Sequence, residues 1–502
     1  MWSTNHPDGG PGGASLGAKA ATSAAPLPAS PPTPLPASPL APPPVGGAPA
    51  SAPDVLERPA REGGLRRLRV HELQLPAGFA TGPGLGARVR FAVGQTVLGL
   101  GLDGVRPIRA WHRRFRWAGL RRRYGLLGAV RWVAAEPVRA LNDARAAVAE
   151  HGATCRDRFG IPLATQRRQL LGLNLAYGTE TATYYQFQLF RPERRRHAGA
   201  YVQQHETATF YRVLAYRDAP DDFLILEDKR RFEQWCAAHA LPCTRTLAEL
   251  HDGAVADPAA ARAALQAHAG YELFSKLVDG KGGAGAHRWR WHEGGRGGWV
   301  DPDGRVLDAD ALLATLAERS REAPLLLQEC LVNHPALAPV ATEVLCTARL
   351  ITARPPDGEP SLVGTCFRTG AGDGSTDNFS QGGIAVAVDA ATGRLGTAVR
   401  ALSAVIVDPI ERHPVSGAAF AGVVLPDWDR AVALARRAHA ALPRIGFVGW
   451  DVALTARGPV LVEGNLSPGT RLAQAPSGEP LGRTALPALL DAHLRRSYAR
   501  RS

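Results

Sequence analysis

Residues 449–469 carry the groups best suited to chemistry, namely two carboxylates and one amide on two strand-like runs. Apolar residues alternate with small or acidic ones on both sides of a turn-like stretch centred on Arg457, and this period predicts a β-hairpin. If the hairpin closes symmetrically about Arg457, Asp451 lies opposite Glu463. Asn465 then projects from the same face as Glu463, because strand side chains repeat every two residues.

This arrangement favours a bound cation. Like charges directly across two strands repel each other, whereas a hard divalent cation prefers oxygen ligands of this kind at short range. Acidic residues beside a hairpin are more often simply solvated. The ending E-x-N-x-x-P-G behind an apolar strand nevertheless favours a magnesium site made by Asp451, Glu463 and Asn465.

A second candidate site lies about 190 residues earlier. Residues 273–278 are strand-like and contain one lysine, Lys276, and the glycine-rich stretch 279–285 follows at once. Glycines let successive backbone N–H groups turn toward one anion, and a lysine adds a compact positive charge. The stretch therefore indicates a phosphate site, although neither the Walker fingerprint nor a Rossmann G-x-G-x-x-G is present.

The order of motifs resembles the ATP-grasp superfamily. After the lysine strand come a hydrophobic strand at 324–331, the sequence D-N-F-S-Q-G-G at 377–383, and the E-x-N strand. Within the superfamily the chain is similar to the ribosomal-modification and glutamate-ligase branch, and more narrowly to the sugar-transfer-associated ATP-grasp proteins, over residues 177–481. The resemblance implies an α+β ATP-grasp fold, with two α+β subdomains clasping ATP.

The resemblance also assigns roles to residues. The phosphates of ATP are expected at Lys276, Gly282, Gly283 and Gly285. Contacts to adenine or ribose are expected from Gln328, Glu329 and Leu331. One or two Mg²⁺ ions are expected at Asp451, Glu463 and Asn465. Stabilisation of transferring charge is expected from Arg349 and Arg368, with Asn378 near the metal or the acceptor.

Some of these residues also allow other interpretations. Arg349 and Arg368 lie on strands at interior-looking positions, and a buried guanidinium needs an anionic partner, which can equally be a structural Asp or Glu. Lys229 opens a helix after Asp228; contact with the nucleotide or the substrate is one interpretation, and a surface lysine, the commoner case, is favoured. Asp427 is expected to cap a helix running to about Leu442 that packs under the sheet.

The activity implied by the resemblance is that of a Mg-ATP-dependent ligase. It would join a carboxylate to an amine through an acyl phosphate, in surface polysaccharide or cell-envelope metabolism, with small-molecule or sugar-linked substrates. Two alternatives remain: an ATP-grasp kinase that phosphorylates a hydroxyl, and a non-catalytic nucleotide-binding partner of a polysaccharide assembly system. Fold analogy alone does not decide among them.

The length of 502 residues is enough for two or three domains. We expect a disordered Pro/Ala/Gly-rich leader at 1–59, because it has almost no residues able to form a core. The rest divides into an Arg-rich, mostly helical region at 60–175, a pre-ATP-grasp segment at 176–250, the ATP-grasp domain at 251–490 and a basic tail at 491–502.

The net charge of +13 is concentrated in an Arg-rich segment between Arg106 and Arg123, where aromatic residues are interleaved. Such a segment suits a membrane surface, nucleic acid or an acidic partner, while a solvated helix face is the commoner case. No nucleic-acid-binding motif accompanies it, so no nucleic-acid partner is inferred. The six cysteines are scattered and no secretory signal is recognised, which favours a cytoplasmic protein with reduced thiols.

Overall fold

The computed structural model describes residues 106–210, 214–215, 218–278, 285–295, 297–372 and 377–499. All the described residues belong to one compact unit. The expected leader at 1–59 therefore lies outside the described residues. Gly282 and Gly283 of the expected phosphate loop also lie outside them.

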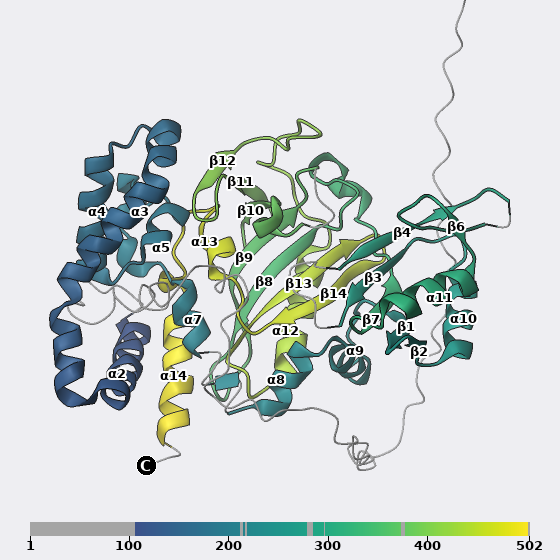
Figure 1. Cartoon of the computed structure of the whole chain (residues 1–502), viewed down its shortest axis with the longest axis horizontal. Coiled ribbons are helices and arrows are strands. Elements are labelled where there is room, and N and C mark those ends of the chain that lie inside the picture. Colours follow the sequence, from purple (N-terminus) through teal and green to yellow (C-terminus); the bar gives the residue numbers. More distant parts are fainter. Residues whose placement is uncertain are drawn as a thin grey trace, which may run out of the picture. The chain divides into compact units, whose positions relative to one another are not determined.

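The first described part of the chain is built of helices (Figure 1). In chain order they are α2 (Arg106–Ala134), α3 (Glu136–Phe159), α4 (Leu163–Tyr177), α5 (Thr181–Gln186), α6 (Pro192–Arg195), the 3-10 helix η2 (Ala198–Ala200), α7 (Gln204–Phe210), α8 (Pro220–Glu227) and α9 (Lys229–Ala238). Helix α2 is interrupted at Gly125, whose φ of 69° is one that glycine adopts without strain. Asp228 caps α9 by accepting hydrogen bonds from the backbone N–H groups of Arg230 and Arg231.

The first sheet has seven strands in the order β2-β1-β7-β3-β4-β5-β6, and its strands pair antiparallel. Its strands are β1 (Thr246–His251), β2 (Ala254–Val255), β3 (Leu273–Leu277), β4 (His287–His292), β5 (Gly298–Val300), β6 (Val306–Leu307) and β7 (Leu325–Glu329). Helices α10 (Pro258–Ala267) and α11 (Ala309–Arg319) share one hydrophobic core with this sheet. Leucines on both helices are fully buried there, as expected for amphipathic helices that cover a sheet.

The second sheet also has seven antiparallel strands, in the order β12-β11-β10-β9-β8-β13-β14. They are β8 (Thr347–Ala353), β9 (Ser361–Thr369), β10 (Ile384–Val388), β11 (Leu395–Ala401), β12 (Val407–Ile410), β13 (Phe447–Thr455) and β14 (Gly458–Asn465). The remaining elements are η4 (Pro335–Val340), η5 (Phe379–Gln381), α12 (Trp428–Ala440), α13 (Thr470–Gln474), η6 (Leu481–Arg483) and α14 (Leu486–Ala499). The two sheets and their covering helices confirm the predicted α+β class.

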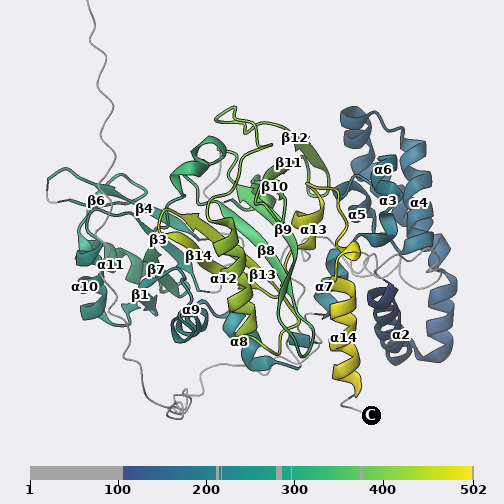
Figure 2. The same ribbon diagram turned by 180° about the vertical axis from the view of Figure 1, so that it is seen from behind.

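Helix α12 lies along one face of the second sheet (Figure 2), where Ala431, Leu434 and Ala438 are buried in its core, as their spacing predicts. The predicted cap is wrong. Asp427 adopts a left-handed conformation with φ of 50°, and its side chain makes no capping hydrogen bond. Its carboxylate instead accepts a hydrogen bond of 3.0 Å from Arg430, so side-chain pairing replaces the cap.

The β13–β14 hairpin closes by a two-residue turn, with Thr455 opposite Gly458. Strict continuation of this register would set Asp451 opposite Val462. The register shifts between Asp451 and Val452, and Asp451 is paired with Glu463 as predicted. An extra residue in β14 therefore lets Leu461 enter the core while Glu463 lies on the opposite face of the sheet.

The N-terminal helices pack against the second sheet. The core that contains Tyr184 and Tyr185 of α5 also contains Cys366 of β9 and Ala385 of β10. The aromatic side chains of α5 therefore form part of the core between the helices and the second sheet.

The division of the chain into segments stays a prediction. Three of its borders fall inside elements, in α4, α14 and β1, which spans residues 246–251. Among the helices of the described ranges, none is long and apolar enough to cross a membrane.

Candidate functional site

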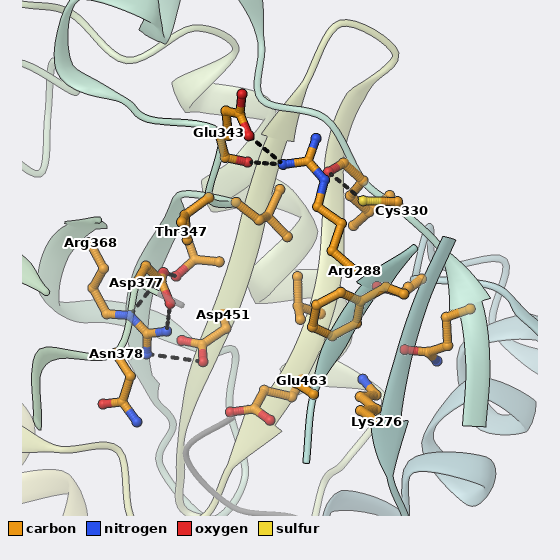
Figure 3. Close-up of a pocket in the computed structure, with 18 of the residues that line it drawn as sticks. Lys276, Arg288, Cys330, Glu343, Thr347, Arg368, Asp377, Asn378, Asp451 and Glu463 are labelled. Atoms are coloured by element: carbon orange, nitrogen blue, oxygen red, sulfur yellow. Dashed lines mark hydrogen bonds and ion pairs between the residues drawn. The ribbon is translucent and has the colours of Figure 1, made fainter. Parts of the chain in front are cut away.

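A cavity of about 990 Å³ opens between the two sheets (Figure 3). Strands β3, β4 and β7 line it from the first sheet, and β8, β9, β13 and β14 line it from the second. Its lining includes the following residues predicted for the site: Lys276, Gln328, Glu329, Leu331, Arg349, Arg368, Asn378, Asp451, Glu463 and Asn465. The fold thus brings together segments that lie almost 200 residues apart in the sequence.

Three charged residues form a row across neighbouring strands. Arg349 on β8 is the register partner of Asp451 on β13, which is in turn the partner of Glu463 on β14. Residues paired in this way project from the same face of a sheet. A cation, an anion and a second anion therefore lie side by side on the cavity wall.

Arg349 holds Asp451 with two hydrogen bonds. Its Nε donates to Oδ1, and its Nη2 donates to Oδ2 at 2.9 Å, while Nη1 donates to the Pro468 carbonyl oxygen at 2.9 Å. Both side chains are buried. Burial by itself would raise the pKa of Asp451, but Arg349 and Arg368 outweigh it and bring that pKa to about 2. Asp451 is therefore ionised over the whole physiological range.

Arg368 belongs to the same network. It donates two hydrogen bonds to Asp377, at 2.6 and 3.2 Å, and one to Oδ2 of Asp451 at 3.3 Å (Figure 3). Thr347 completes the cluster by donating to Asp377 at 2.6 Å. Burial would lower the pKa of Arg368, but the two aspartates raise it above its ordinary value. Both predicted arginines thus have carboxylate partners within the protein.

Glu463 has less charge compensation. Burial first, and then the negative charge of Asp451, raise the pKa of Glu463 above that of an ordinary glutamate. Asn465 donates from Nδ2 to Oε1 of Glu463 at 3.1 Å, which leaves the amide oxygen Oδ1 for another partner. A pair of carboxylates with an excess of negative charge is an environment that a bound cation would stabilise.

The donor set fits a hard cation. Asp451, Glu463 and Asn465 offer carboxylate and amide oxygens, the ligands typical of Mg²⁺. Within the described ranges, no group of three or more His, Cys, Asp and Glu side chains is arranged to hold a metal. The amide oxygen of Asn465 is therefore needed to complete the set.

Lys276 faces the carboxylates from the other sheet (Figure 3). Burial lowers the pKa of Lys276 to about 8, and the nearby Glu463 counteracts this effect only in part. A buried ammonium with a lowered pKa gains from any anion brought beside it. This is the property expected of a phosphate-binding lysine.

Lys229 contradicts its interpretation as a surface residue. It is half-buried and lines the cavity, and its Nζ donates to the Val278 carbonyl oxygen at 2.5 Å. Its positive charge also contributes to the lowered pKa of Lys276. The cavity therefore carries two lysines at the end where β3 leaves the sheet.

The end of β7 forms the other boundary of the cavity. Gln328 is buried and donates to Oγ1 of Thr246 at 3.1 Å, while Glu329 accepts hydrogen bonds from the backbone N–H of Arg245 and from Arg457. Leu331 packs with Ala453 and Val460. This combination of an apolar wall and fixed polar groups is typical of a small-molecule pocket.

Two further predicted residues are placed by the structure. Asn378 lines the cavity beside Asp377. Gly285 precedes β4 with φ of 70°, and a Cβ there would lie 2.8 Å from the Leu277 side chain, so this turn requires glycine.

Several contributing residues were not assigned from the sequence. Asp377 and Thr347 hold Arg368, and Arg288 reaches over the mouth of the cavity to the backbone oxygen of Glu343 at 2.8 Å (Figure 3). Asp377 belongs to the motif D-N-F-S-Q-G-G, but the sequence did not indicate that its partner is Arg368. Nothing in the sequence distinguishes Arg288 from the many other arginines.

Comparison with known proteins supports these observations. The profile of the family described as "Sugar-transfer associated ATP-grasp" matches residues 211–486, more than half of the chain. Comparison with curated proteins gives no match.

Among solved structures, the chain is similar to an ADP complex of N5-carboxyaminoimidazole ribonucleotide synthetase (12% identity, 51% of this chain and 50% of that chain, TM-score 0.30). It is also similar to D-alanine–D-alanine ligase from Bacillus anthracis (13% identity, 56% and 71%, TM-score 0.31) and to a RimK domain ATP-grasp protein from Sphaerobacter thermophilus (17% identity, 55% and 78%, TM-score 0.27). The chain spans about half the length of the synthetase.

The motif order, the cavity between two sheets and the extent of the profile match lead to one conclusion. The chain belongs to the sugar-transfer-associated ATP-grasp family.

Proposed function

We propose that the protein is a Mg-ATP-dependent ligase that joins a carboxylate to an amine through an acyl phosphate. The observation that carries the proposal is the convergence of Lys276, Asp451, Glu463 and Asn465 on one cavity. A protein that only binds a partner would not need a half-buried lysine facing the buried Asp451 and the half-buried Glu463, because charged groups are costly to remove from water.

The nucleotide would occupy the side of the cavity formed by the first sheet. Gln328, Glu329 and Leu331 would contact adenine and ribose, and Lys276 would bind the phosphates together with Gly282, Gly283 and Gly285. Support comes from the lowered pKa of Lys276, since phosphate would restore the favourable environment that burial removes. Lys229 would add a second positive charge at the same end.

Asp451, Glu463 and Asn465 would hold one or two Mg²⁺ ions. Bound Mg²⁺ would neutralise charge on the phosphate oxygens during phosphoryl transfer. Arg349 fixes Asp451 in place by a two-point hydrogen bond, so the position of this ligand does not depend on the cation.

The reaction would proceed in two steps. A carboxylate oxygen of the acceptor attacks the γ-phosphorus and ADP leaves, giving an acyl phosphate. The amine then attacks the acyl carbon, phosphate leaves and the amine loses a proton. Arg349 and Arg368, held on the cavity wall beside Asn378, would stabilise charge that develops on the transferring oxygens.

The test is a product assay. Purified protein with Mg-ATP is supplied with panels of carboxylates and amines, and we expect ADP, free phosphate and an amide to form together. A phosphate ester without free phosphate would identify a kinase instead. Failure of the wild type to bind Mg-ATP would overturn the proposal.

The cellular setting is also a proposal. The name of the family connects it with sugar transfer, which supports a role in surface polysaccharide or cell-envelope metabolism with sugar-linked or small-molecule substrates. Because the proposed reaction consumes ATP, we propose that the protein acts in the cytoplasm.

The Arg-rich segment is proposed as a peripheral contact with a membrane or a protein. Helix α2 contains nine arginines and no acidic residue. After the break at Gly125 it exposes Leu126 and Leu127, which are 57% and 77% accessible. Apolar side chains beside a basic cluster suit an anionic lipid surface.

A further inference from the structure

Arg471 lies on α13, a short helix whose position is fixed from outside the sheet. Thr470 and Gln474 both donate to the Val202 carbonyl oxygen, at 3.2 and 2.8 Å, and Oε1 of Gln474 accepts from the Val202 N–H at 3.0 Å. These bonds hold one face of the helix against the N-terminal region. Arg471, which follows Thr470, is directed toward Phe379 of the 3-10 helix η5 instead.

The guanidinium of Arg471 stacks on an aromatic ring. Its Cζ lies 4.9 Å from the ring centroid of Phe379, which is almost completely buried. Within the ranges that the structure describes, neither a carboxylate nor a carbonyl oxygen accepts a hydrogen bond from this guanidinium. A cation–π contact compensates only part of the cost of removing such a group from water.

The contrast with Arg368 shows how unusual this is. Both arginines lie beside the segment that contains Asp377 and Phe379. Two aspartates raise the pKa of Arg368, whereas burial lowers the pKa of Arg471 and no neighbouring carboxylate offsets it. Asp377 is already held by Arg368 and Thr347 and cannot serve both arginines equally.

Arg471 and Phe379 are not among the residues that line the cavity, but each has a chain neighbour that does. Leu472, which follows Arg471, and Asn378, which precedes Phe379, both line it. This side of the cavity belongs to the second sheet, and Lys276 lies on the first. Arg349 and Arg368 donate to protein carboxylates, whereas no carboxylate or carbonyl oxygen of the described ranges accepts from Arg471, so its hydrogen-bond donors are available to a ligand.

We infer that Arg471 binds an oxyanion, a carboxylate or a phosphate, of the acceptor substrate. Assignment of this oxyanion to the acceptor substrate rests on the proposed ligase function, whereas the presence of an oxyanion site at Arg471 does not. The stacked ring of Phe379 orients the planar guanidinium, which suits two-point binding of a carboxylate or phosphate.

The test uses the full chain saturated with magnesium and a non-hydrolysable ATP analogue, so that the nucleotide phosphate site is filled. Malonate and inorganic phosphate are titrated separately by calorimetry. We expect the wild type to bind at least one of them, and Arg471→Gln to bind it about tenfold more weakly or worse, because a hydrogen-bonded charge is lost. Preference for malonate or for phosphate identifies the kind of group.

Two matched variants complete the design. Arg471→Lys keeps the charge and should lose much less affinity than the glutamine variant. Arg483→Gln removes an exposed arginine from the same part of the chain and should behave as the wild type. Equal anion binding by wild type and Arg471→Gln, or no binding by the wild type, would overturn the inference.

Thermal unfolding without added anions gives an independent readout. An anion site predicts that Arg471→Gln is as stable as the wild type or more so, since a poorly compensated charge is removed. A clear loss of stability with unchanged anion binding would mean that Arg471 only packs on Phe379. Binding of the ATP analogue is measured in the same samples and separates the two proposals. If anions bind through Arg471 but the nucleotide does not bind, the ligase proposal is rejected and the anion site is retained.

Discussion

Asp451 lies directly opposite Glu463, although the hairpin turn alone would place Val462 there. One extra residue in β14 produces this pairing, and it sets the buried Asp451 against the half-buried Glu463 on the cavity wall. Arg349 neutralises Asp451 from the neighbouring strand. The excess of negative charge therefore remains at Glu463, where the pKa is raised.

Replacement of Glu463 by glutamine should abolish turnover and weaken magnesium-dependent nucleotide binding. A ligand at about a hundred times its dissociation constant stabilises a protein by roughly 2.7 kcal/mol, which is visible as a rise in melting temperature. We expect the wild type to show this rise with ATP and magnesium but not with ATP and a chelator. The exposed Glu479→Gln serves as control, and an unchanged response of Glu463→Gln would remove this residue from the metal site.

Replacement of Lys276 by alanine should raise the dissociation constant of Mg-ATP tenfold or more. A hydrogen bond to a charged group contributes about 1.5 to 3 kcal/mol, and the burial of Lys276 excludes competing water. Calorimetry measures the constant directly. Lys229→Ala is the informative comparison, since this lysine already donates to the Val278 carbonyl oxygen and should matter less.

Nucleotide affinity should fall as pH rises through about 8. Lys276 loses its proton there in the free protein, whereas bound phosphates favour the charged form. Lys276→Arg should bind with little dependence on pH between 7 and 9.5, because a guanidinium remains charged. Parallel pH profiles for both proteins would contradict the assignment.

The same pKa has an effect on stability. Between about 8 and the ordinary lysine value of 10.5, the unfolded chain binds more protons at this position than the folded protein. The contribution of Lys276 to the free energy of unfolding therefore rises with pH in that window. Lys276→Met should be more stable than the wild type at pH 7, and this advantage should shrink toward pH 10.5 in denaturant titrations.

Replacement of Asp377 by asparagine should lower the free energy of unfolding by about 3 kcal/mol, because it leaves the buried Arg368 with Asp451 as its main partner. Urea titration measures the loss. Asp310→Asn breaks the exposed pair with Arg262 and should cost less than about 1 kcal/mol. Similar losses in the two variants would show that the network around Arg368 is not specially important for stability.

The surface of α2 should bind vesicles that contain anionic lipid. Co-sedimentation with phosphatidylglycerol vesicles should exceed that with phosphatidylcholine and should weaken in high salt. Combined replacement of Leu126 and Leu127 by serine should reduce binding, while Val424→Ser, at another exposed apolar residue, should not. Equal binding by both variants would favour a protein partner for this surface.

The sequence predicted the local pieces of the site well. The alternation in residues 448–463 predicted the hairpin, and Lys276 was correctly assigned to a strand. Asp451 is paired with Glu463 as predicted, but the turn is not centred on Arg457 and a register shift restores the pairing. The register shift in β14 could not be predicted, because the alternating pattern of the sequence does not indicate where a β-bulge occurs.

Long-range partners could not be predicted. Arg349 and Asp451 are 102 residues apart, and the sequence only indicated that a buried arginine needs an anion. The same limit explains the wrong interpretation of Lys229, whose hydrogen-bond acceptor, the Val278 carbonyl oxygen, lies 49 residues later in the chain. At Asp427 the local signal itself misled, since its pairing with Arg430 replaced the expected cap.

The bonds between Val202 and Gln474 have a consequence for how the protein unfolds. Trp111 and Val202 share one core with Leu486 and Leu490 of the C-terminal helix, and α5 shares another with the second sheet. The family-matched region, residues 211–486, therefore shares its cores with segments on both sides of it. We expect the helices before it and α14 after it to unfold together with the second sheet in a single cooperative transition, so that a destabilising substitution in the N-terminal helices should also disrupt the cavity.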